Sequence, residues 1–414
     1  MAGRDGANGN KHSRSAKGGR RLLFGVGAGA GVFLAAAAMA TGSAAPAKAD
    51  FEDLLDPIIQ PLLTSVTDAI SGVDPAAATD LTSWTDSLLS SLNSIDLAVP
   101  SAESAAATAS SAEPAAVQGT YDIPITIAEN TEPTVQATVD GANTTDLVDT
   151  GSSGLVIPET DLSATQLTDL GIPNSFGESG YSGGVDYIYL TYDNATVDYG
   201  GSGLDTTAPV EVEVYSWDPS DLSSLFTNDA FQNFLSDNDV TGILGIGDDT
   251  SGGAGESPIE AAGFTGVTVD LPQNYLVVSD SNPGTAYAEL PSGGSTPTSD
   301  LTETVTDGNG VVGTGSVSDD LDSGGVYGTI PESITGSSDT VPDGDMVTVS
   351  DDGTPLYSYI VENDGANGLP NESPTAVTGD DIDSGYQAFE NNPVYIDYAS
   401  DTLSYDDLLP ADEL

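Results

Sequence analysis

The sequence predicts an all-β protein of two similar lobes, preceded by a helical hairpin and a linker. From residue 121 onward, short β-branched and aromatic runs alternate with clusters of Gly, Asn, Asp and Ser, a pattern typical of strands joined by turns. This region of about 295 residues is too long for one ordinary sandwich, so two lobes are the natural division. A twelve-residue pattern also occurs twice in this region, which indicates that the two lobes are related.

The first 49 residues are expected to form an export signal. A basic segment ends in Arg20–Arg21, a small-residue apolar run follows from Leu22 to Ala40, and Ala47-Lys48-Ala49 forms an A-x-A cleavage site. The paired arginines favour the twin-arginine route, with a Sec signal as the alternative. A retained anchor is less favoured, because the apolar run is Gly-rich and a cleavage site follows it. We therefore expect a secreted or cell-surface protein that meets the membrane only during export.

The numbers and positions of the charged residues limit the kinds of catalytic and binding site that the chain can form. The chain has 65 Asp and Glu residues, 7 Lys and Arg residues, one histidine and no cysteine, with a net charge of −58. All the basic residues and His12 precede residue 50. The exported chain therefore excludes Ser-His-Asp and Cys-His sites, a Schiff-base lysine and a His/Cys zinc site. It also lacks a cationic surface for nucleic acid. An enzyme of this composition must use carboxylates, with tyrosine or a bound metal as the remaining options.

Residues 50–95 are predicted to form a helical hairpin. Apolar residues recur at helical spacing over residues 51–71 and again over 81–95, with residues 72–80 as the turn. Pro57 and Pro61 indicate that the first helix begins late or is kinked. Residues 96–118 are rich in Ala, Ser, Pro and Glu and are predicted to be a flexible linker.

The strongest signal is the internal repeat. Residues 149–160 read DTGSSGLVIPET and residues 322–333 read DSGGVYGTIPES, an offset of 173 residues. Each copy fits a strand that ends at an acid, a turn of small residues, and a second strand. Two such lobes facing each other would bring Asp149 and Asp322 together at a pseudo-two-fold axis. The remaining pairs in register are Thr150 with Ser323, Gly151 with Gly324, Ile157 with Ile330, Pro158 with Pro331 and Glu159 with Glu332.

Paired carboxylates can hydrolyse a peptide bond without a cofactor or a metal. Ionising both of two carboxyl groups in one site costs electrostatic free energy, so they share a proton. One then acts as general base towards a water molecule, while the other acts as general acid towards the carbonyl oxygen. A glycine after each acid lets the two turns approach closely. The predicted site is therefore the pair Asp149 and Asp322, with Gly151 and Gly324 in the turns.

The repeat resembles the D-[TS]-G loops of pepsin-like aspartic proteases, and more narrowly the aspartic proteases of mycobacterial PE-PGRS proteins. The resemblance covers residues 119–414, with lobes at 119–278 and 279–414. It implies an endopeptidase, expected to be monomeric, that acts on polypeptides, including exported proteins or itself. It also implies that the hydroxyl groups of Thr150 and Ser323 form hydrogen bonds with the backbone of the opposite loop. Ser152 would donate a hydrogen bond to the outer oxygen of Asp149.

Further segments extend the resemblance. Gly242-Ile-Leu-Gly-Ile-Gly247 is similar to the apolar strand that supports the first catalytic loop. Gly385, Phe389 and the strand from Val394 to Asp397 are similar to the closing part of the second lobe. The resemblance also implies a hairpin flap that bears a tyrosine. For this residue we expect Tyr199, with Tyr192 as the alternative.

Two other functions stay open. Gly325 lacks the hydroxyl expected three residues after Asp322, while Asp320 and Asp383–Ser384 are polar where the family has apolar strands. These departures suggest a catalytically silent, pepsin-like binding protein. The segment from Asp237 to Asp248 has acids and a glycine at calcium-loop positions, which suggests an acidic calcium-binding surface protein. Its flanks are not convincing helices, so we expect no metal there.

Overall fold

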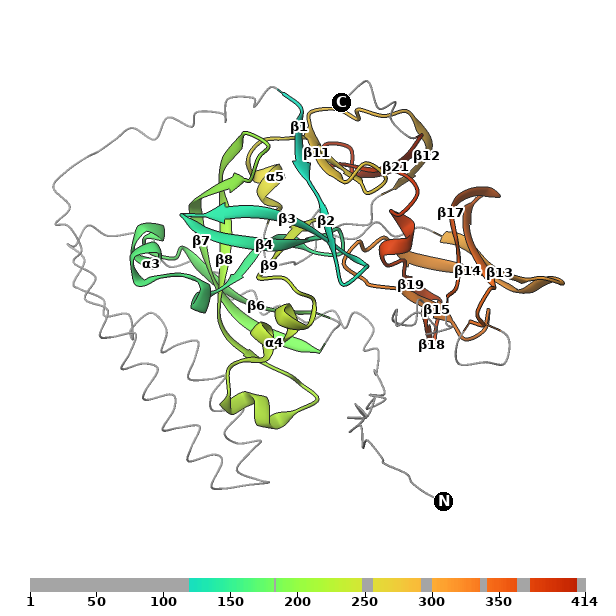
Figure 1. The fold of residues 1–414 in the computed structure, drawn as a ribbon, viewed down its shortest axis with the longest axis horizontal. Coiled ribbons are helices and arrows are strands. Elements are labelled where there is room, and N and C mark those ends of the chain that lie inside the picture. The colour runs from blue at the N-terminus through green and yellow to red at the C-terminus, as the bar shows by residue number, and fades with distance from the viewer. Residues whose placement is uncertain are drawn as a thin grey trace, which may run out of the picture.

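The computed structural model describes residues 119–181, 184–247, 256–291, 300–335, 341–362 and 373–407. The predicted signal, hairpin and linker lie outside the described residues. Strands dominate the described part, which confirms the all-β prediction (Figure 1). Its helical segments are short: α3 (Ala164–Leu170), α4 (Ala230–Asp237), α5 (Pro258–Ala261), η1 (Glu159–Asp161), η2 (Leu222–Phe226) and η3 (Tyr386–Ala388).

An eight-stranded sheet forms the first lobe. Its central strand β9 lies parallel to β4 on one side and antiparallel to β5 on the other. The strands β7 and β8 form a long hairpin whose register shifts between Tyr192 and Ala195. In spatial order the sheet contains β2 (Thr126–Ala128), β3 (Glu132–Val139), β4 (Ala142–Asp149), β9 (Gly242–Ile246), β5 (Ser153–Pro158), β8 (Leu204–Trp217), β7 (Val185–Tyr199) and β6 (Ser175–Tyr181).

The second lobe repeats this plan on a smaller scale. Its five-stranded sheet contains β17 (Thr354–Ile360), β16 (Met346–Asp351), β13 (Asp300–Asp307), β14 (Gly310–Asp320) and β19 (Asp381–Asp383). A parallel pair lies beside it, formed by β15 (Thr329–Pro331) and β18 (Thr375–Val377). The parallel contact of β14 with β19 corresponds to that of β4 with β9. The prediction of two related lobes is therefore confirmed.

A six-stranded sheet joins the two halves of the chain. Its order is β1 (Tyr121–Pro124), β11 (Tyr275–Ser279), β10 (Gly266–Asp270), β20 (Val394–Asp397), β21 (Thr402–Asp406) and β12 (Ala286–Pro291). The first three strands come from the first half of the domain and the last three from the second. The halves meet where β10 pairs with β20, with Thr268 opposite Tyr395. This shared sheet was not predicted from the sequence.

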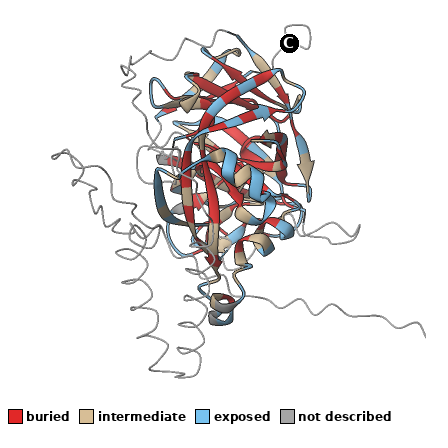
Figure 2. Ribbon diagram, turned by 90° about the vertical axis from the view of Figure 1, so that its left-hand side faces the viewer, coloured by how far each residue is buried: buried red, intermediate tan, exposed pale blue. Residues whose placement is uncertain are grey.

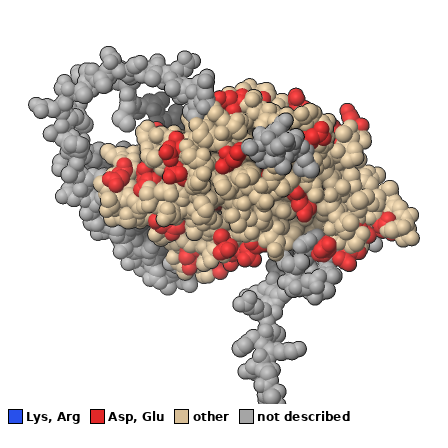
Figure 3. Space-filling model, turned by 45° about the horizontal axis from the view of Figure 1, so that its top comes forward, with Lys and Arg blue, Asp and Glu red and all other residues tan. Residues whose placement is uncertain are grey.

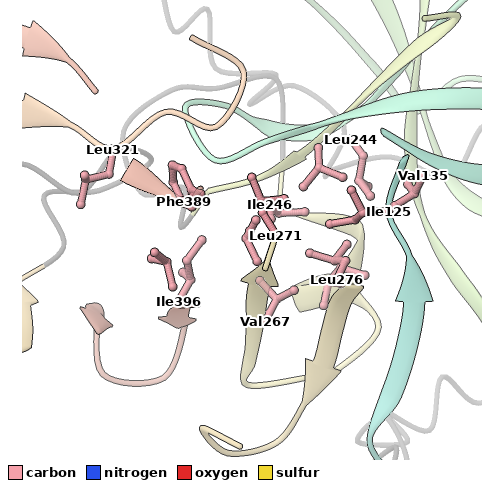
Figure 4. Close-up of a cluster of buried hydrophobic side chains, with 14 of the residues drawn as sticks. Ile125, Val135, Leu244, Ile246, Val267, Leu271, Leu276, Leu321, Phe389 and Ile396 are labelled. Atoms are coloured by element: carbon pink, nitrogen blue, oxygen red, sulfur yellow. The ribbon is translucent and has the colours of Figure 1, made fainter. Parts of the chain in front are cut away.

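The main hydrophobic core is continuous across the lobes. Buried residues form the inner faces of the sheets (Figure 2). Figure 4 shows Ile246 of β9 between Leu244 and Phe389 of the second half in this view, with Val267 of β10 and Leu321 in the same cluster. The strand β9 is buried along its whole length. The residues that carry the predicted site therefore rest on packed apolar side chains.

The calcium alternative does not fit this fold. Residues Gly242 to Ile246 would form the middle of a calcium loop, but they are the buried strand β9, paired on both sides. A strand of the core therefore occupies the segment that would have to form the calcium loop. Within the described ranges, no three His, Cys, Asp or Glu side chains gather in a way that could hold a metal ion. The described helices are too short to cross a bilayer.

The surface of the described part carries one sign of charge. Figure 3 shows acidic side chains spread over the visible face, with no Lys or Arg among them. Because every basic residue precedes residue 50, residues 119–407 contain no cationic side chain that could pair with these acids. Interactions between their ionised side chains are therefore all repulsive.

Candidate active site

The two copies of the repeat occupy equivalent places in the two lobes. In the first lobe, Asp149 ends β4 and lies opposite Gly245 of β9 in parallel register. In the second lobe, β14 ends at Asp320, two residues before Asp322, and pairs in parallel with β19. Each aspartate thus lies at or just after the end of a strand, at the point where a turn of small residues begins. The structure brings these two turns together.

Four hydrogen bonds join the turns, in two symmetric pairs. The N–H of Thr150 donates to Ser323 Oγ over 3.1 Å, and the N–H of Ser323 donates to Thr150 Oγ1 over 2.9 Å. The Thr150 hydroxyl donates to the carbonyl oxygen of Leu321 over 2.5 Å, and the Ser323 hydroxyl donates to that of Val148 over 2.7 Å. Both hydroxyl side chains are fully buried. This is the arrangement that the resemblance implied for the two residues.

The two carboxyl groups approach each other because glycines follow them. A Cβ atom on Gly151 would lie 2.5 Å from Asp322 Cγ, and one on Gly324 would lie 3.1 Å from Asp149 Oδ1. Any side chain at Gly151 would therefore displace the carboxyl group of Asp322. The carboxyl groups of Asp149 and Asp322 are in hydrogen-bonding contact.

Each aspartate also accepts a hydrogen bond from its own turn. The N–H of Gly151 donates to Asp149 Oδ1 over 2.9 Å, and the N–H of Gly324 donates to Asp322 Oδ1 over 2.8 Å. Ser152 Oγ donates to Asp149 Oδ2 over 2.5 Å. The equivalent residue of the second turn is Gly325, which has no hydroxyl group. The two turns therefore match in their backbone donors and differ in this side-chain donor.

The electrostatic surroundings favour a shared proton. Burial raises the pKa of Asp322 well above its ordinary value, and the charges of Asp149, Asp383 and Asp320 raise it further. No Lys, Arg or His lies among the described residues to oppose this shift. Because the carboxyl groups interact directly, their protons belong to the pair. Asp322 therefore retains its proton at a pH where an isolated aspartate would have lost it.

The structure does not place the expected flap tyrosines over the site. Tyr199 is fully buried at the end of β7, and Tyr192 is 6% exposed. Both side chains belong to the core of the first lobe. The prediction of Tyr199 or Tyr192 was wrong, because a flap residue must be able to contact a ligand and these rings are packed inside the lobe.

Tyr181 is a better candidate for the flap tyrosine, although it was not predicted from the sequence. It ends β6, next to the turn that leads into β7, and is half-buried. Its ring stacks on Tyr187 and Phe234, at centroid distances of 5.7 and 5.5 Å. Burial raises the pKa of the Tyr181 phenol, and the neighbouring Tyr187 and Asp149 raise it further. The signal that could have identified it is the turn sequence Tyr181-Ser-Gly-Gly between two strand-like runs.

Most of the described part of the chain is similar to known proteins. Residues 121–405 match the family model of the PE-PGRS C-terminal aspartyl peptidase-like domain. The chain is 33% identical over 295 residues to PE cleavage protein A of Mycobacterium tuberculosis, a match that covers 67% of this chain and 50% of that protein. It is also 33% identical over 294 residues to PE cleavage protein A of Mycobacterium marinum, with the same coverage of both chains. The chain thus spans about half the length of the curated relatives that it matches.

Among solved structures, the chain is similar to a crystal structure of the aspartic proteinase from Irpex lacteus. The TM-score is 0.49 and the sequence identity 14%, with 70% of this chain and 97% of that one covered. The family model covers more than half of the chain and includes both copies of the repeat. The chain belongs to the family of the PE-PGRS C-terminal aspartyl peptidase-like domain.

Proposed function

We propose that the protein is an aspartic endopeptidase in which Asp149 and Asp322 form the catalytic pair. The observation that carries this proposal is the direct contact of two carboxyl groups on symmetric, mutually hydrogen-bonded turns. Two carboxylates in contact repel each other strongly if both are ionised, so the arrangement favours a state in which they share one proton. Acid–base hydrolysis by two carboxyl groups requires this shared proton.

The proposed mechanism needs no group beyond the pair and a water molecule. One carboxylate removes a proton from the water, whose oxygen attacks the peptide carbonyl carbon. The other carboxyl group gives its proton to the carbonyl oxygen, so no charged oxyanion has to form. Breakdown of the tetrahedral intermediate then transfers a proton to the leaving amine. The N–H groups of Gly151 and Gly324 and the Ser152 hydroxyl hold the carboxylates in position.

The substrate is proposed to be a polypeptide at the cell surface or outside the cell. The predicted signal at residues 1–49 supports export, and the mycobacterial relatives are named PE cleavage protein A, which supports a polypeptide substrate. A surface without cationic side chains favours basic or neutral peptides and repels acidic ones. Exported proteins with basic or neutral segments are therefore the expected substrates, and self-cleavage of this acidic chain is a separate proposal that the charge argument does not favour.

The test is hydrolysis of a denatured protein between pH 3 and 7 by the wild type, Asp149→Asn and Asp322→Asn. Each substitution keeps the shape of the side chain and removes one acid. We expect cleavage by the wild type at acidic pH, and a loss of at least about 100-fold in each variant, because a general acid or base contributes about 100- to 10,000-fold. Equal cleavage by all three proteins would refute the proposed pair. Sequencing the N-terminus of the product chain tests self-cleavage.

A catalytically silent binding protein is the second candidate. The observation that favours it is the group of extra acids in the second lobe, where Asp320 and Asp383 lie opposite each other. Added negative charge beside the pair would hinder ionisation of the general base. A folded wild type that binds a polypeptide but shows no turnover at any pH would support this second candidate.

A further inference from the structure

The second lobe has a carboxyl group where the first has a serine hydroxyl. Asp383 ends β19, three residues long, and lies opposite Asp320 at the end of β14. A Cβ atom added to Gly325 would overlap the carboxyl group of Asp383, with Oδ1 nearest, Cγ at 2.6 Å and Oδ2 at 2.7 Å. The carboxyl group of Asp383 therefore fills the space in which a side chain at residue 325 would lie.

In the first lobe, the position equivalent to residue 325 is occupied by a hydrogen-bond donor. The repeat offset of 173 residues places Gly325 at the position of Ser152, whose hydroxyl donates to Asp149 Oδ2 over 2.5 Å. The backbone donors of the two turns are the same, since Gly151 and Gly324 both donate to the carboxylate of their own turn. The second turn lacks only the side-chain donor, and the carboxyl group of Asp383 lies in its place.

We propose that Asp383, in its neutral form, donates to Asp322 the hydrogen bond that Ser152 donates to Asp149. Asp383 is then a positioning residue for the proposed peptidase reaction, on which this inference rests. A carboxyl group can donate only when it is protonated. The role therefore requires surroundings that keep Asp383 neutral.

The surroundings meet this requirement. Acids face Asp383 from two sides: Asp320 across the strand pair, and the aspartates 149 and 322 in the two turns. Asp319, next to Asp320, is also affected by the charge of Asp383, and no cationic side chain lies in the described ranges. Burial is the main cause that raises the pKa of Asp383 to about 7, and the charge of Asp149 adds to it.

A hydrogen bond from the backbone of Gly385 orients the carboxyl group of Asp383. The N–H of Gly385 donates to Asp383 Oδ1 over 2.8 Å, so this oxygen is an acceptor and the other is left to carry the proton. The N–H of Asp383 donates to Thr329 Oγ1 over 2.8 Å. The end of β19 is thus held against the second turn, with the carboxyl group in the space beside Gly325.

The test compares replacements of the donor at residues 325 and 383. Asp383→Ala removes the donor, and Gly325→Ser alone makes its Cβ overlap Asp383. We expect each to lower kcat about 10- to 100-fold with little change in KM, since a hydrogen bond to a charged group contributes about 1.5–3 kcal/mol. Combining the two should restore kcat to within about threefold of the wild type. Gly325 has no positive φ, so serine can adopt its backbone conformation.

A matched double variant separates hydrogen bonding from packing. Asp383→Ala with Gly325→Ala fills the space but offers no hydroxyl, and should stay as slow as Asp383→Ala. Equal rescue by alanine and serine, or full kcat in Asp383→Ala, would overturn the inference. The absence of rescue by serine in a variant that keeps the thermal midpoint of the wild type would also overturn it.

A second measurement does not depend on turnover. The ¹³C carboxyl shift of Asp383 in the wild-type protein should show a neutral group at pH 5. An ionised Asp383 at that pH would overturn the inference even in an active enzyme. A neutral Asp383 in a protein that hydrolyses nothing would instead contradict the proposed function and leave the hydrogen-bond donor in place.

Discussion

Thr150 and Ser323, 173 residues apart, exchange hydrogen bonds: the N–H of each donates to the hydroxyl oxygen of the other. Each hydroxyl then donates to a carbonyl oxygen of the opposite lobe. The lobes are thus joined at the residues next to Asp149 and Asp322, and the distance between the two carboxyl groups depends on this link.

The hydrogen bonds between Thr150 and Ser323 predict that substitutions of these two residues have non-additive effects on stability. Thr150→Val and Ser323→Ala should each lower the free energy of unfolding by about 1–3 kcal/mol, because each leaves a buried N–H group without its acceptor. The double variant should lose less than the sum, by at least about 0.5 kcal/mol, since the two residues share the same bonds. Urea unfolding of the four proteins measures this coupling. Strict additivity would show that the two residues act independently.

Ser152→Ala should lower kcat/KM about 10- to 100-fold, because it removes a charge-assisted hydrogen bond to Asp149 Oδ2. The thermal midpoint should change by only a few degrees, because Ser152 is half-buried and outside the core. Ser202→Ala is the matched control, since its hydroxyl donates to the carbonyl oxygen of Tyr199 at the far end of β7. Equal kcat/KM in both variants would exclude a role for Ser152 in the reaction.

The two candidate flap tyrosines should respond differently to truncation. Tyr181→Ala should lower kcat/KM, because the Tyr181 ring lies at the end of a hairpin and the charge of Asp149 contributes to the raised pKa of its phenol. Tyr199→Ala should instead lower the free energy of unfolding by about 3–5 kcal/mol, as expected for a buried aromatic ring. Peptide hydrolysis and urea unfolding of both variants test this. Full kcat/KM in Tyr181→Ala would mean that Tyr181 does not contact the substrate.

Stability should fall as the pH rises. Burial is the main cause that raises the pKa of Glu132 to about 8, of Asp146 to about 7 and of Glu303 to about 8. In the unfolded chain these groups titrate near pH 4. Their contribution is therefore complete below about pH 4 and is lost as the pH rises through 7 to 8.

Urea unfolding between pH 3 and 9 measures this slope. Glu303→Gln should flatten it, because the amide does not titrate, whereas Glu390→Gln at an exposed position should not. A stability maximum at neutral pH in the wild type would contradict the prediction.

Added salt should stabilise the protein at neutral pH. The described part has acidic side chains and no basic ones, so screening weakens repulsion without weakening any ion pair. The thermal midpoint at pH 7 should rise between 0.01 and 0.5 M NaCl, over which the Debye length falls from about 30 Å to about 4 Å. The rise should shrink at pH 4, where many carboxylates are protonated. A midpoint that falls with salt would indicate stabilising ion pairs.

The residues that meet at the candidate site could be predicted from the sequence because each of them lies in a short, recognisable motif. Asp149, Asp322 and their turns belong to short motifs repeated in register, and an internal repeat implies equivalent positions in two lobes. The shared six-stranded sheet was missed because β10 pairs with β20 more than a hundred residues away. No periodicity within either strand specifies its partner.

The flap and the role of Asp383 were missed for different reasons. Alternation alone could not show which tyrosines of β7 face inward, because the register shifts between Tyr192 and Ala195. Asp383 lies in a strand of three residues, too short for any pattern. The sequence showed only that Asp383 and Gly325 depart from the family pattern. Their contact requires the strand and the turn to be packed together.

The six-stranded sheet makes the two halves of the domain mutually dependent parts of one assembly. A cut between β11 and β12 would leave two fragments, each with three strands of this sheet and one of the two aspartates. Each fragment would expose an open strand edge, β10 or β20, as a specific docking surface for the other. Hydrolysis would then be a property of the reassembled pair, and its rate at low concentration would rise with the product of the two fragment concentrations.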